Sequence, residues 1–382
     1  MRPAGAGTCG MTDRVSIAII HGNDGSDVRV GKLCRSFVKM GFDVHFIGWD
    51  RRPDESKHID LSTAAQHVMR HGTAHGKSSA FGHLRYVRHV LSVLSRVRPD
   101  VVYAVNEENA FFALFGKRLL YRGLICDVFD SLVDRHSHRP WWIRVLLMAV
   151  AFSTRSGADR LIATDAARHA RFGRFRDKCV VVENYPERVD AAIAQQMPQG
   201  PVKVWVGGTL TETRGLRQVL DAVASLDNVS ILSAGWPYDD FAATRFVTDP
   251  KVDFRGITTA LEALQLAASC DAVLAYYAPT STNNLYASPN KIYDALCIGR
   301  PVIINEEIHV ATFVRDQGLG MLCAYDDVAC LRAVIAGLRG RRDSLAAFAD
   351  RTRGLFEARY NWERVEPTLR DLVVSVAGRG GA

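Results

Sequence analysis

The sequence lacks the marks of several protein classes. No apolar run in its 382 residues approaches the roughly 20 residues that a membrane span needs, and the first ten residues have no apolar core like that of a signal peptide. Its eight cysteines form no C-x-x-C pair and have no histidine at zinc-finger spacing, which excludes a zinc finger and a disulfide framework. We therefore expect reduced, mostly buried thiols in a cytoplasmic protein.

The composition is that of a globular chain, with 48% apolar and 23% charged residues, which excludes a wholly disordered, collagen-like or coiled-coil protein. The formal net charge of +7 is unevenly distributed: residues 1–200 contain 29 Lys and Arg against 20 Asp and Glu, and residues 201–382 contain 19 against 21. A basic first half predicts an anionic partner, either nucleic acid, lipid head groups or a phosphorylated substrate. Charge alone does not choose among these three.

Short β-branched runs alternate with helical patterns along the whole chain, which predicts parallel sheets with crossover helices. Residues 183–202 lose the apolar period and contain three prolines, so we place a domain boundary there. The predicted fold class is α/β, with two tandem Rossmann-like, doubly wound parallel-sheet domains and a C-terminal helix. The expected parts are a disordered tail over 1–12, a first domain over 13–185, a linker over 186–201, a second domain over 202–358, and a C-terminal helix and tail over 359–382.

Doubly wound sheets bind ligands beyond the carboxyl ends of their strands, so the site is expected in the cleft between the two domains. Strands are predicted at 15–21, 43–49, 101–106, 124–130, 160–164 and 178–184 in the first domain, and at 202–206, 229–234, 252–254, 271–277, 301–305 and 320–324 in the second.

The first strand of the second domain leads into a glycine-containing turn, VWVGGTLTETRGL, in which two glycines end the strand and Arg214 opens a helix. Glycines let backbone N–H groups approach an anion closely, and a helix start adds partial positive charge. The alternative is an ordinary strand-to-helix turn whose glycines only satisfy backbone geometry. The turn is neither a G-x-G-x-x-G motif nor a P-loop, so a nicotinamide or P-loop assignment has little support.

The segment SPNKIYDALCIGRPVIIN is the most informative in the chain. Ser288 caps a predicted helix whose first turn contains Asn290 and Lys291, so free N–H groups and a cation meet at one point. A cation in the first turn opposes the helix dipole, and an anionic ligand explains it better than helix stability does. Asp294 lies one turn later and can accept hydrogen bonds from a ribose diol or sugar hydroxyls. The alternative for Lys291 is an ordinary surface lysine without a ligand, and the alternative for Asp294 is a solvated helix carboxylate.

Five segments follow one another over about 170 residues: GGTLTETRGL, SAGW, VDFRGITTALEALQLAASCDAVLAYY, SPNKIYDALCIGRPVI and YNWERVEPTLRDLV. Their order and spacing resemble those of the C-terminal half of family 4 glycosyltransferases of the B-type fold. The segment HGNDGSDVRVGKLCRSFVKMGFDVHFIG is similar to the opening strand, glycine-containing loop and helix of that family.

The resemblance implies that Gly208 and Arg214 contact the diphosphate of a nucleotide-sugar donor, with Lys291 near the same phosphates. It also implies that Asp294 binds the ribose, and that Gly235 and the turn around Gly256 frame the base. The implied donor-binding residues are Gly208, Thr209, Gly235, Gly256, Ile257, Ser288, Asn290 and Asp294, and the implied catalytic residues are Arg214, Lys291 and Asp130.

On the acceptor side, the resemblance matches residues 22–25 with a loop that closes on donor and acceptor, and FDSLVDRHSH with a segment lining the acceptor. General-base help from Asp130 or a histidine fits this placement. The alternative is a solvated polar loop, and two histidines at i, i+2 make a poor metal site, so no metal is expected. The acceptor-side residues are Gly22, Asn23, Gly25, His136 and His138.

Two features depart from the family's pattern. Where many members carry two glutamates eight positions apart, this chain has Tyr286 and Asp294, and Thr209 stands where many members have a second cation. Lys291 can compensate for that cation. The resemblance implies transfer with retention by same-face attack, and cations around the diphosphate would stabilise the charge that develops on departure. No metal or other cofactor is expected, and the expected substrate is a UDP- or GDP-linked nucleotide sugar.

Residues 141–152, WWIRVLLMAVAF, contain one charged residue and have basic flanks. So short a run is most often a buried core helix. Adjacent tryptophans beside cations also fit a helix that lies on a membrane surface, and the basic first half favours this interpretation. The predicted basic cluster is Lys117, Arg118, Arg122, Arg135 and Arg139.

The sequence therefore predicts a cytoplasmic glycosyltransferase, peripherally associated with the inner face of the cell membrane. Its first domain would bind a lipid-linked or saccharide acceptor and its second the nucleotide sugar, in the assembly of a bacterial surface polysaccharide or glycolipid. One alternative is a sugar-nucleotide epimerase of the same fold. The least favoured is a basic nucleic-acid-binding protein, because the chain has no recognisable nucleic-acid module, and no nucleic-acid partner is expected.

Overall fold

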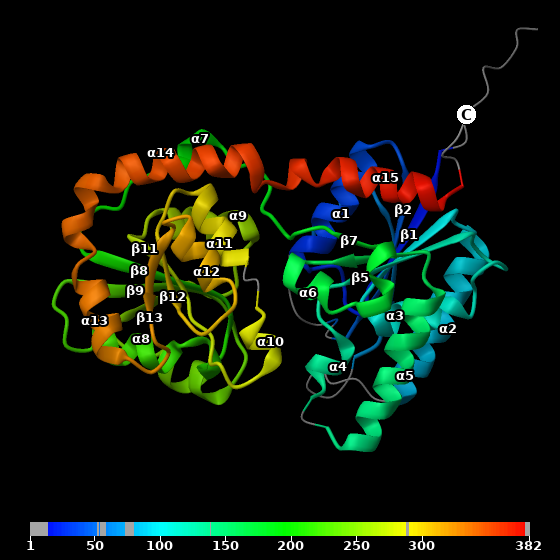
Figure 1. The fold of residues 1–382 in the computed structure, drawn as a ribbon, viewed down its shortest axis with the longest axis horizontal. Coiled ribbons are helices and arrows are strands. Elements are labelled where there is room, and N and C mark those ends of the chain that lie inside the picture. Colours follow the sequence, from blue (N-terminus) through cyan, green and yellow to red (C-terminus); the bar gives the residue numbers. More distant parts are fainter. Residues whose placement is uncertain are drawn as a thin grey trace, which may run out of the picture. The chain divides into compact units, whose positions relative to one another are not determined.

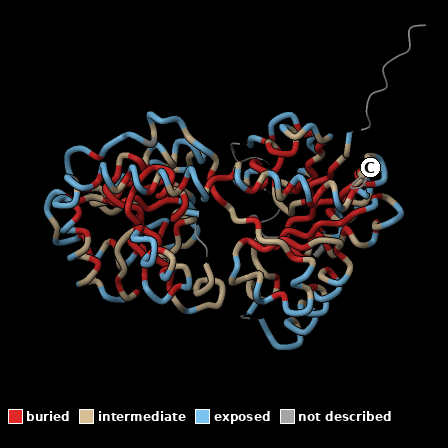
Figure 2. The backbone as a smooth tube through the Cα atoms, turned by 45° about the horizontal axis from the view of Figure 1, so that its top comes forward, coloured by how far each residue is buried: buried red, intermediate tan, exposed pale blue. Residues whose placement is uncertain are grey.

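The computed structural model describes residues 14–51, 53, 59–72, 80–137, 139–287 and 290–378. The predicted tail over 1–12, His138 and Ser288 lie outside the described residues. The described chain forms two compact units, one of residues 14–182 with 367–378 and one of residues 183–366. In each unit, buried residues follow the central strands (Figure 2).

The first unit contains a seven-stranded parallel sheet in the order β3-β2-β1-β4-β5-β6-β7. Its central strands are apolar and buried on both faces, as a parallel sheet covered by helices requires. The strand order reverses between β1 and β4, so the carboxyl ends of these two strands form the topological switch point, where such sheets bind ligands. The strands are β1 Ser16–Ile20, β2 Asp43–Asp50, β3 Ala65–Arg70, β4 Val101–Val105, β5 Gly123–Val128, β6 Arg160–Ala163 and β7 Cys179–Val181.

Helices cover both faces of this sheet, with α2, α3 and α5 on one face and α1 and α15 on the other (Figure 1). Helix α1 begins at Asp27, whose carboxylate accepts hydrogen bonds from the backbone N–H groups of Arg29 and Val30. The helices are α1 Val28–Lys39, α2 Ala80–Val97, α3 Glu107–Leu114, α4 Leu132–Arg135, α5 Trp141–Gly157, α6 Ala166–Ala170 and α15 Glu366–Val376. No helix among the described residues of either unit is long and apolar enough to cross a membrane.

The second unit repeats this plan with a six-stranded parallel sheet in the order β10-β9-β8-β11-β12-β13. Its switch point lies between β8 and β11. The strands are β8 Val202–Leu210, β9 Val229–Pro237, β10 Val252–Phe254, β11 Ala272–Ala275, β12 Val302–Asn305 and β13 Gly320–Cys323. The helices are α7 Ala191–Ala194, α8 Leu216–Val223, α9 Ala260–Ala268, α10 Thr282–Leu285, α11 Asn290–Cys297, α12 Ala311–Asp316, α13 Val328–Ala336 and α14 Arg342–Arg359.

The predicted fold class is confirmed, and three details differ from the expectation. Strand β3 was not predicted. Strands β8 and β9 run on to Leu210 and Pro237, because their ladder continues through Gly208 and Gly235, so the glycines after Val206 do not end the strand.

The last helix of the chain belongs with the first unit. Helix α14 packs against α11 in the second unit, whereas the chain from Pro367 onward, most of α15, groups with the first. Close packing against β5 depends on Gly123, because a Cβ there would lie 2.0 Å from Cγ1 of Val376. The grouping of this helix with the first unit was not predicted.

Candidate functional site

Two cations converge at the carboxyl end of the sheet in the second unit. Arg214 lies just before α8, and Lys291 lies in the first turn of α11. Both approach the ring of Tyr277, which follows β11: the guanidinium carbon of Arg214 lies 5.4 Å and the ammonium nitrogen of Lys291 lies 5.9 Å from its centroid. The fold therefore brings together two side chains that are 77 positions apart in the sequence.

Three predicted glycines lie beside these cations on adjacent strand ends. Gly208 has a φ of +87°, and a Cβ there would lie 4.0 Å from Cε of Lys291. A Cβ on Gly235 would come within 1.9 Å of the carbonyl oxygen of Gly208, so no other residue fits there. The N–H group of Gly235 donates a 2.8 Å hydrogen bond to the carbonyl oxygen of Gly256. Gly208 therefore leaves the space next to Lys291 free of a side chain, and Gly235 allows the close approach of the neighbouring strand.

Neither cation is neutralised by a neighbouring side chain. Within the described residues, no carboxylate forms an ion pair with Arg214 or Lys291, and neither side chain makes a hydrogen bond. Desolvation and, to a smaller extent, repulsion by Arg214 together lower the pKa of Lys291 to about 7, with attraction by Asp294 acting in the opposite direction. A desolvated cation without a partner is a destabilising feature that a bound anion would relieve.

The remaining predicted donor residues surround this cluster at varying depth. Asp294 is partly buried and lies one turn after Lys291 in α11. Thr209 is partly buried in β8, Asn290 is exposed at the start of α11, and the side chain of Ile257 is 75% exposed beyond Gly256. Ser288, the predicted cap, lies outside the described residues.

An aromatic pair at the end of β9 was missed by the sequence analysis. The rings of Trp236 and Tyr238 meet edge to face with centroids 5.3 Å apart, and the side chains are 38% and 64% exposed. They directly follow Gly235, in the SAGW motif and just after it. The signal in the sequence was the presence of two aromatic residues just after the glycine that ends the SAG segment.

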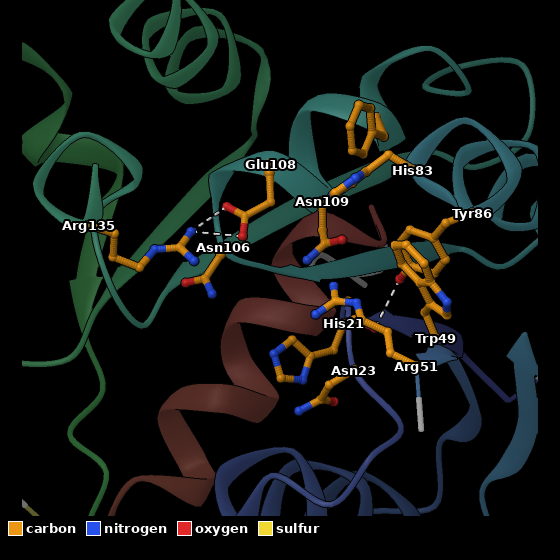
Figure 3. A pocket seen from close by; sticks show the side chains of 12 residues that line it. His21, Asn23, Trp49, Arg51, His83, Tyr86, Asn106, Glu108, Asn109 and Arg135 are labelled. Atoms are coloured by element: carbon orange, nitrogen blue, oxygen red, sulfur yellow. Dashed lines mark hydrogen bonds and ion pairs between the residues drawn. The ribbon is translucent and has the colours of Figure 1, made fainter. Parts of the chain in front are cut away.

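A cavity of about 190 Å³ lies in the first unit at the carboxyl ends of β1, β2 and β4 (Figure 3). Trp49 and Tyr86 stack in its wall with ring centroids 5.6 Å apart, and the Tyr86 hydroxyl donates a hydrogen bond to the carbonyl oxygen of His21. The lining residues are His21, Gly22, Asn23, Trp49, Arg51, His83, Tyr86, Asn106, Glu108, Asn109, Phe112 and Arg135.

The polar groups of this cavity are held in place by the surrounding fold. One guanidinium nitrogen of Arg135 lies 2.8 Å from each carboxylate oxygen of Glu108. The side-chain oxygen of Asn106 accepts hydrogen bonds from the backbone N–H groups of Phe129 and Asp130, and Asn106 has a φ of +66°. A non-glycine residue in the left-handed region is strained, and strain of this kind concentrates at functional sites.

The predicted acceptor-side residues separate into two groups. Gly22 and Asn23 line the cavity. Gly25 does not line it, because Gly25 packs against Phe46 and Leu61, where a Cβ would lie 2.9 Å from Cδ1 of Leu61. His136 does not line the cavity either, and its Nδ1 lies 2.9 Å from the carbonyl oxygen of Leu132.

Asp130, the predicted base, is 42% exposed, and a guanidinium nitrogen of Arg168 lies 3.3 Å from its Oδ1. It does not line the cavity. Among the described residues, no group of three or more His, Cys, Asp or Glu is arranged to hold a metal ion.

Residues 24–185 match the family model described as a glycosyl transferase 4-like domain. The matched residues make up most of the first unit, which is therefore similar to such domains. The predicted resemblance is thereby confirmed, although most of the motifs that suggested it lie in the second unit, outside the matched residues. No curated protein matches the chain in sequence.

Solved glycosyltransferases share the fold of this chain over almost its whole length. A sucrose-phosphate synthase from Thermosynechococcus elongatus has a TM-score of 0.73 at 14% identity, covering 96% of this chain and 100% of that one. The Anabaena protein HepE, in complex with UDP-glucose, has a TM-score of 0.69 at 15% identity, covering 95% and 100%. WaaG, a glycosyltransferase involved in lipopolysaccharide biosynthesis, has a TM-score of 0.64 at 13% identity, covering 96% and 100%. The chain therefore has the B-type glycosyltransferase fold.

The first unit contains cavity residues that the sequence did not mark. These residues come from three separate segments, and none belongs to a recognisable motif: Trp49 and Arg51 lie at and just after the end of β2, Tyr86 in α2 and Asn109 in α3. Glu108 follows the predicted strand at 101–106 and likewise belongs to no motif. They are brought together only by the order of the strands, because β1 lies between β2 and β4 in the sheet, so their proximity becomes visible only when that order is known.

Proposed function

We propose that this protein is a retaining glycosyltransferase that moves a sugar from a nucleotide diphosphate to a saccharide or lipid-linked acceptor. The observation that carries the proposal is the convergence of Arg214 and Lys291, both without a carboxylate partner in the described chain, on a glycine-lined strand end. This arrangement is suited to a diphosphate, which carries its charge on oxygens that accept from both cations. The proposed pathway is assembly of a bacterial surface polysaccharide or glycolipid.

In this proposal Arg214 and Lys291 act as catalytic residues. They would bind the diphosphate of a UDP- or GDP-linked sugar and stabilise the negative charge that develops as the glycosidic bond to it breaks. Two fixed cations supply the stabilisation that Mg²⁺ gives in other transferases, which supports a reaction without metal. Same-face attack by the acceptor hydroxyl, with its proton passing to the leaving diphosphate, would retain configuration.

Asp130 remains the proposed residue that assists as a base on the acceptor side. Its side chain is partly exposed, and its 3.3 Å contact with Arg168 is longer than a strong ion pair. The carboxylate can therefore accept a hydrogen bond from the acceptor hydroxyl and orient it, while the proton itself passes to the leaving diphosphate. Gly208, Thr209, Gly235, Gly256, Ile257, Ser288 and Asn290 complete the proposed donor site, and Gly22, Asn23, Gly25, His136 and His138 the proposed acceptor side.

Nucleotide binding tests the function most directly. UDP or GDP is expected to raise the Tm of the protein, because a ligand that binds only the native state stabilises it. Purified protein supplied with nucleotide sugars and saccharide acceptors should then release nucleotide diphosphate only when an acceptor is present. Conversion of a nucleotide sugar without an acceptor would support the epimerase alternative instead, and no shift with either nucleotide would contradict both.

The pKa of Lys291 predicts a pH dependence for nucleotide binding. The free protein loses the Lys291 proton near pH 7, and a bound diphosphate raises that pKa because it stabilises the ammonium form. Affinity for UDP should therefore be highest below pH 7 and fall as the pH rises above 7. Calorimetric titrations between pH 6 and pH 9, repeated with Lys291→Ala, check this. An equal pH dependence in both proteins would attribute the effect to another group.

Asp294 is proposed to bind the ribose. The Asp294→Asn variant is expected to bind UDP or GDP about tenfold more weakly, because a charged acceptor of the diol is replaced by a neutral amide. Asp294→Glu should retain much of the affinity, since it restores the carboxylate that the family more often carries. Parental affinity in both variants would remove Asp294 from the site.

The proposed acceptor fits an enzyme at a membrane surface, and helix α5 provides the surface. Trp141 and Trp142 are 75% and 54% exposed, and Val145, Leu146, Met148 and Phe152 are exposed on the same helix. The positions 141, 145, 148 and 152 recur at helical spacing, so they form one apolar stripe that faces away from the sheet. We propose that this α5 stripe docks on the inner face of the cell membrane.

A further inference from the structure

The cavity in the first unit carries an excess of positive charge. Its lining contains Arg51, Arg135 and Glu108 as formally charged side chains. Arg135 and Glu108 neutralise each other through their ion pair. Arg51 has no ion pair or hydrogen bond with any described residue, and its guanidinium carbon lies over the ring of Trp49 at 4.6 Å. Arg51 therefore faces the cavity without a contacting carboxylate, and the nearby carboxylates of Glu108 and Asp24 act on it only through their charge.

Three nitrogen atoms of the lining are buried without a hydrogen-bond partner among the described residues. They are Nδ1 of His21, Nε of Arg51 and Nε of Arg135. A buried polar atom without a partner costs about 1–3 kcal/mol, so three of them in one cavity indicate groups that a ligand would satisfy. All three can carry a proton and donate a hydrogen bond.

These side chains surround one space. Figure 3 shows His21, Asn23, Arg51 and Asn109 around the middle of the cavity, with the Arg135–Glu108 pair at its side. The space is also bounded by Gly22, since a Cβ on Gly22 would lie 3.5 Å from Nη2 of Arg51 and 3.7 Å from Oδ1 of Asn109. Its volume of about 190 Å³ leaves room for an acidic group with part of the sugar that carries it.

We propose that this cavity selects an acceptor that carries an oxyanion, a carboxylate or a phosphate ester on its sugar, and that Arg51 is the residue that binds the oxyanion. The inference rests on the proposed glycosyltransferase function and specifies its acceptor. Arg51 would donate from its guanidinium, and His21 Nδ1 would donate a further hydrogen bond. Glu108, held by Arg135, would accept from a sugar hydroxyl and repel an acidic group placed at the wrong end of the cavity.

The test is calorimetric titration of the full chain with glucuronate, glucose 6-phosphate, glucose and inorganic phosphate. Saturating UDP is present so that Arg214 and Lys291 are occupied. At least one acidic sugar is expected to bind at least tenfold more tightly than glucose. The carboxylate and phosphate-ester probes distinguish the two kinds of acidic sugar, and inorganic phosphate shows whether the anion alone is sufficient.

Two variants attribute that binding to the cavity. Arg51→Gln is expected to lose tenfold or more in affinity for the acidic sugar, the loss of one charge-assisted contact. Gly22→Ala keeps every charge but places a methyl group beside Arg51, at distances of ordinary contact, and should weaken binding without unfolding the protein. Arg88→Gln removes an equal charge from an exposed position of α2 and should leave the affinity unchanged. Melting curves identify any variant that is destabilised.

The proposal is overturned if glucose binds as tightly as both acidic sugars, if neither acidic sugar binds, or if Arg51→Gln and Gly22→Ala both retain the parental affinity. Failure of UDP and GDP to bind the parent protein is a different result, since it contradicts the donor site in the second unit. The effect of Arg51→Gln on acidic sugars can still be measured in that case, so the two failures are distinguishable.

Discussion

The Lys291→Ala variant is expected to bind UDP or GDP about ten- to 100-fold more weakly than the parent protein and to transfer sugar more slowly. The loss reflects one charge-assisted contact to the diphosphate, about 1.5–3 kcal/mol. Because the leaving diphosphate carries more charge in the transition state, the loss in kcat should be at least as large as the loss in affinity. Calorimetric titration and initial rates measure the two effects.

Replacement of Lys291 by an apolar residue of similar length should not destabilise the protein. Since the folded-state pKa of Lys291 is lowered to about 7 from an ordinary value near 10.4, the unfolded chain binds more protons between these pH values, and the charged lysine disfavours folding at neutral pH. Lys291→Met, which retains an apolar side chain of similar length, is therefore expected to melt at a higher temperature than the parent at pH 7. A lower Tm would show that Lys291 stabilises the fold and would weaken its assignment to a ligand site.

Lys203→Ala is a suitable control for both measurements. Lys203 lies at the amino end of β8, remote from the strand end that carries Gly208, and is partly buried like Lys291. Nucleotide affinity should be unchanged in this variant. Equal weakening by Lys203→Ala and Lys291→Ala would indicate a general effect of net charge rather than a contact with the diphosphate.

Most of the fold could be predicted because its strands are buried on both faces. Val101–Val105 is a continuous apolar run and Gly123–Val128 is apolar except for Asp127, a pattern that only the interior of a parallel sheet or a buried helix accommodates. Strand β3 escaped prediction for the opposite reason. Its sequence, AQHVMR, has one β-branched residue and no buried one, and it forms a strand at the sheet edge because β2 supplies a pairing partner.

The donor site was more visible in the sequence than the cavity of the first unit. Lys291 opposes a helix dipole, and that local conflict can be recognised without any structure. Arg51 and Tyr86 conflict with nothing in their own segments. They contribute to one cavity only because β1 pairs with β2 on one side and β4 on the other, and this order is a property of the whole sheet.

The predicted basic cluster shows how a charge count can mislead. Lys117 is bound by Asp159 at 2.8 Å, and Arg135 is bound by Glu108, so neither is a free surface cation. Arg118, Arg122 and Arg139 are exposed as expected. The sequence cannot distinguish these cases, since the carboxylate partners lie 42 and 27 positions away.

Replacement of Trp141 and Trp142 by Ser is expected to reduce binding of the protein to anionic vesicles tenfold or more. Two exposed indoles that enter the headgroup region contribute roughly 3 kcal/mol together by burying apolar surface. Co-sedimentation with phosphatidylglycerol vesicles at low salt measures this. Phosphatidylcholine vesicles should bind the parent more weakly, because exposed cations such as Arg139 and Arg144 contribute about 1 kcal/mol each near an anionic surface.

The stability of this double variant separates membrane docking from core packing. If α5 were buried in the core, replacing both tryptophans would lower the free energy of unfolding by several kcal/mol. Because these side chains are 75% and 54% exposed, we expect the Tm to change little. Phe81→Ser with Leu84→Ser removes another exposed apolar pair of the first unit, at 64% and 58% exposure, and should leave vesicle binding intact if docking is specific to the α5 stripe.

Salt and helix length define the mode of binding that is expected. Helix α5 has 17 residues, about 25 Å of helix, shorter than the ~30 Å hydrocarbon core, so the α5 stripe can only lie along the surface. Raising the ionic strength shortens the Debye length from ~10 Å at 0.1 M to ~3 Å at 1 M. Vesicle binding should therefore weaken as the electrostatic attraction is screened, whereas the contribution of the tryptophans to binding should persist. Absence of binding to anionic vesicles at low salt would contradict the membrane proposal. The donor site would be unaffected, because its residues belong to the second unit.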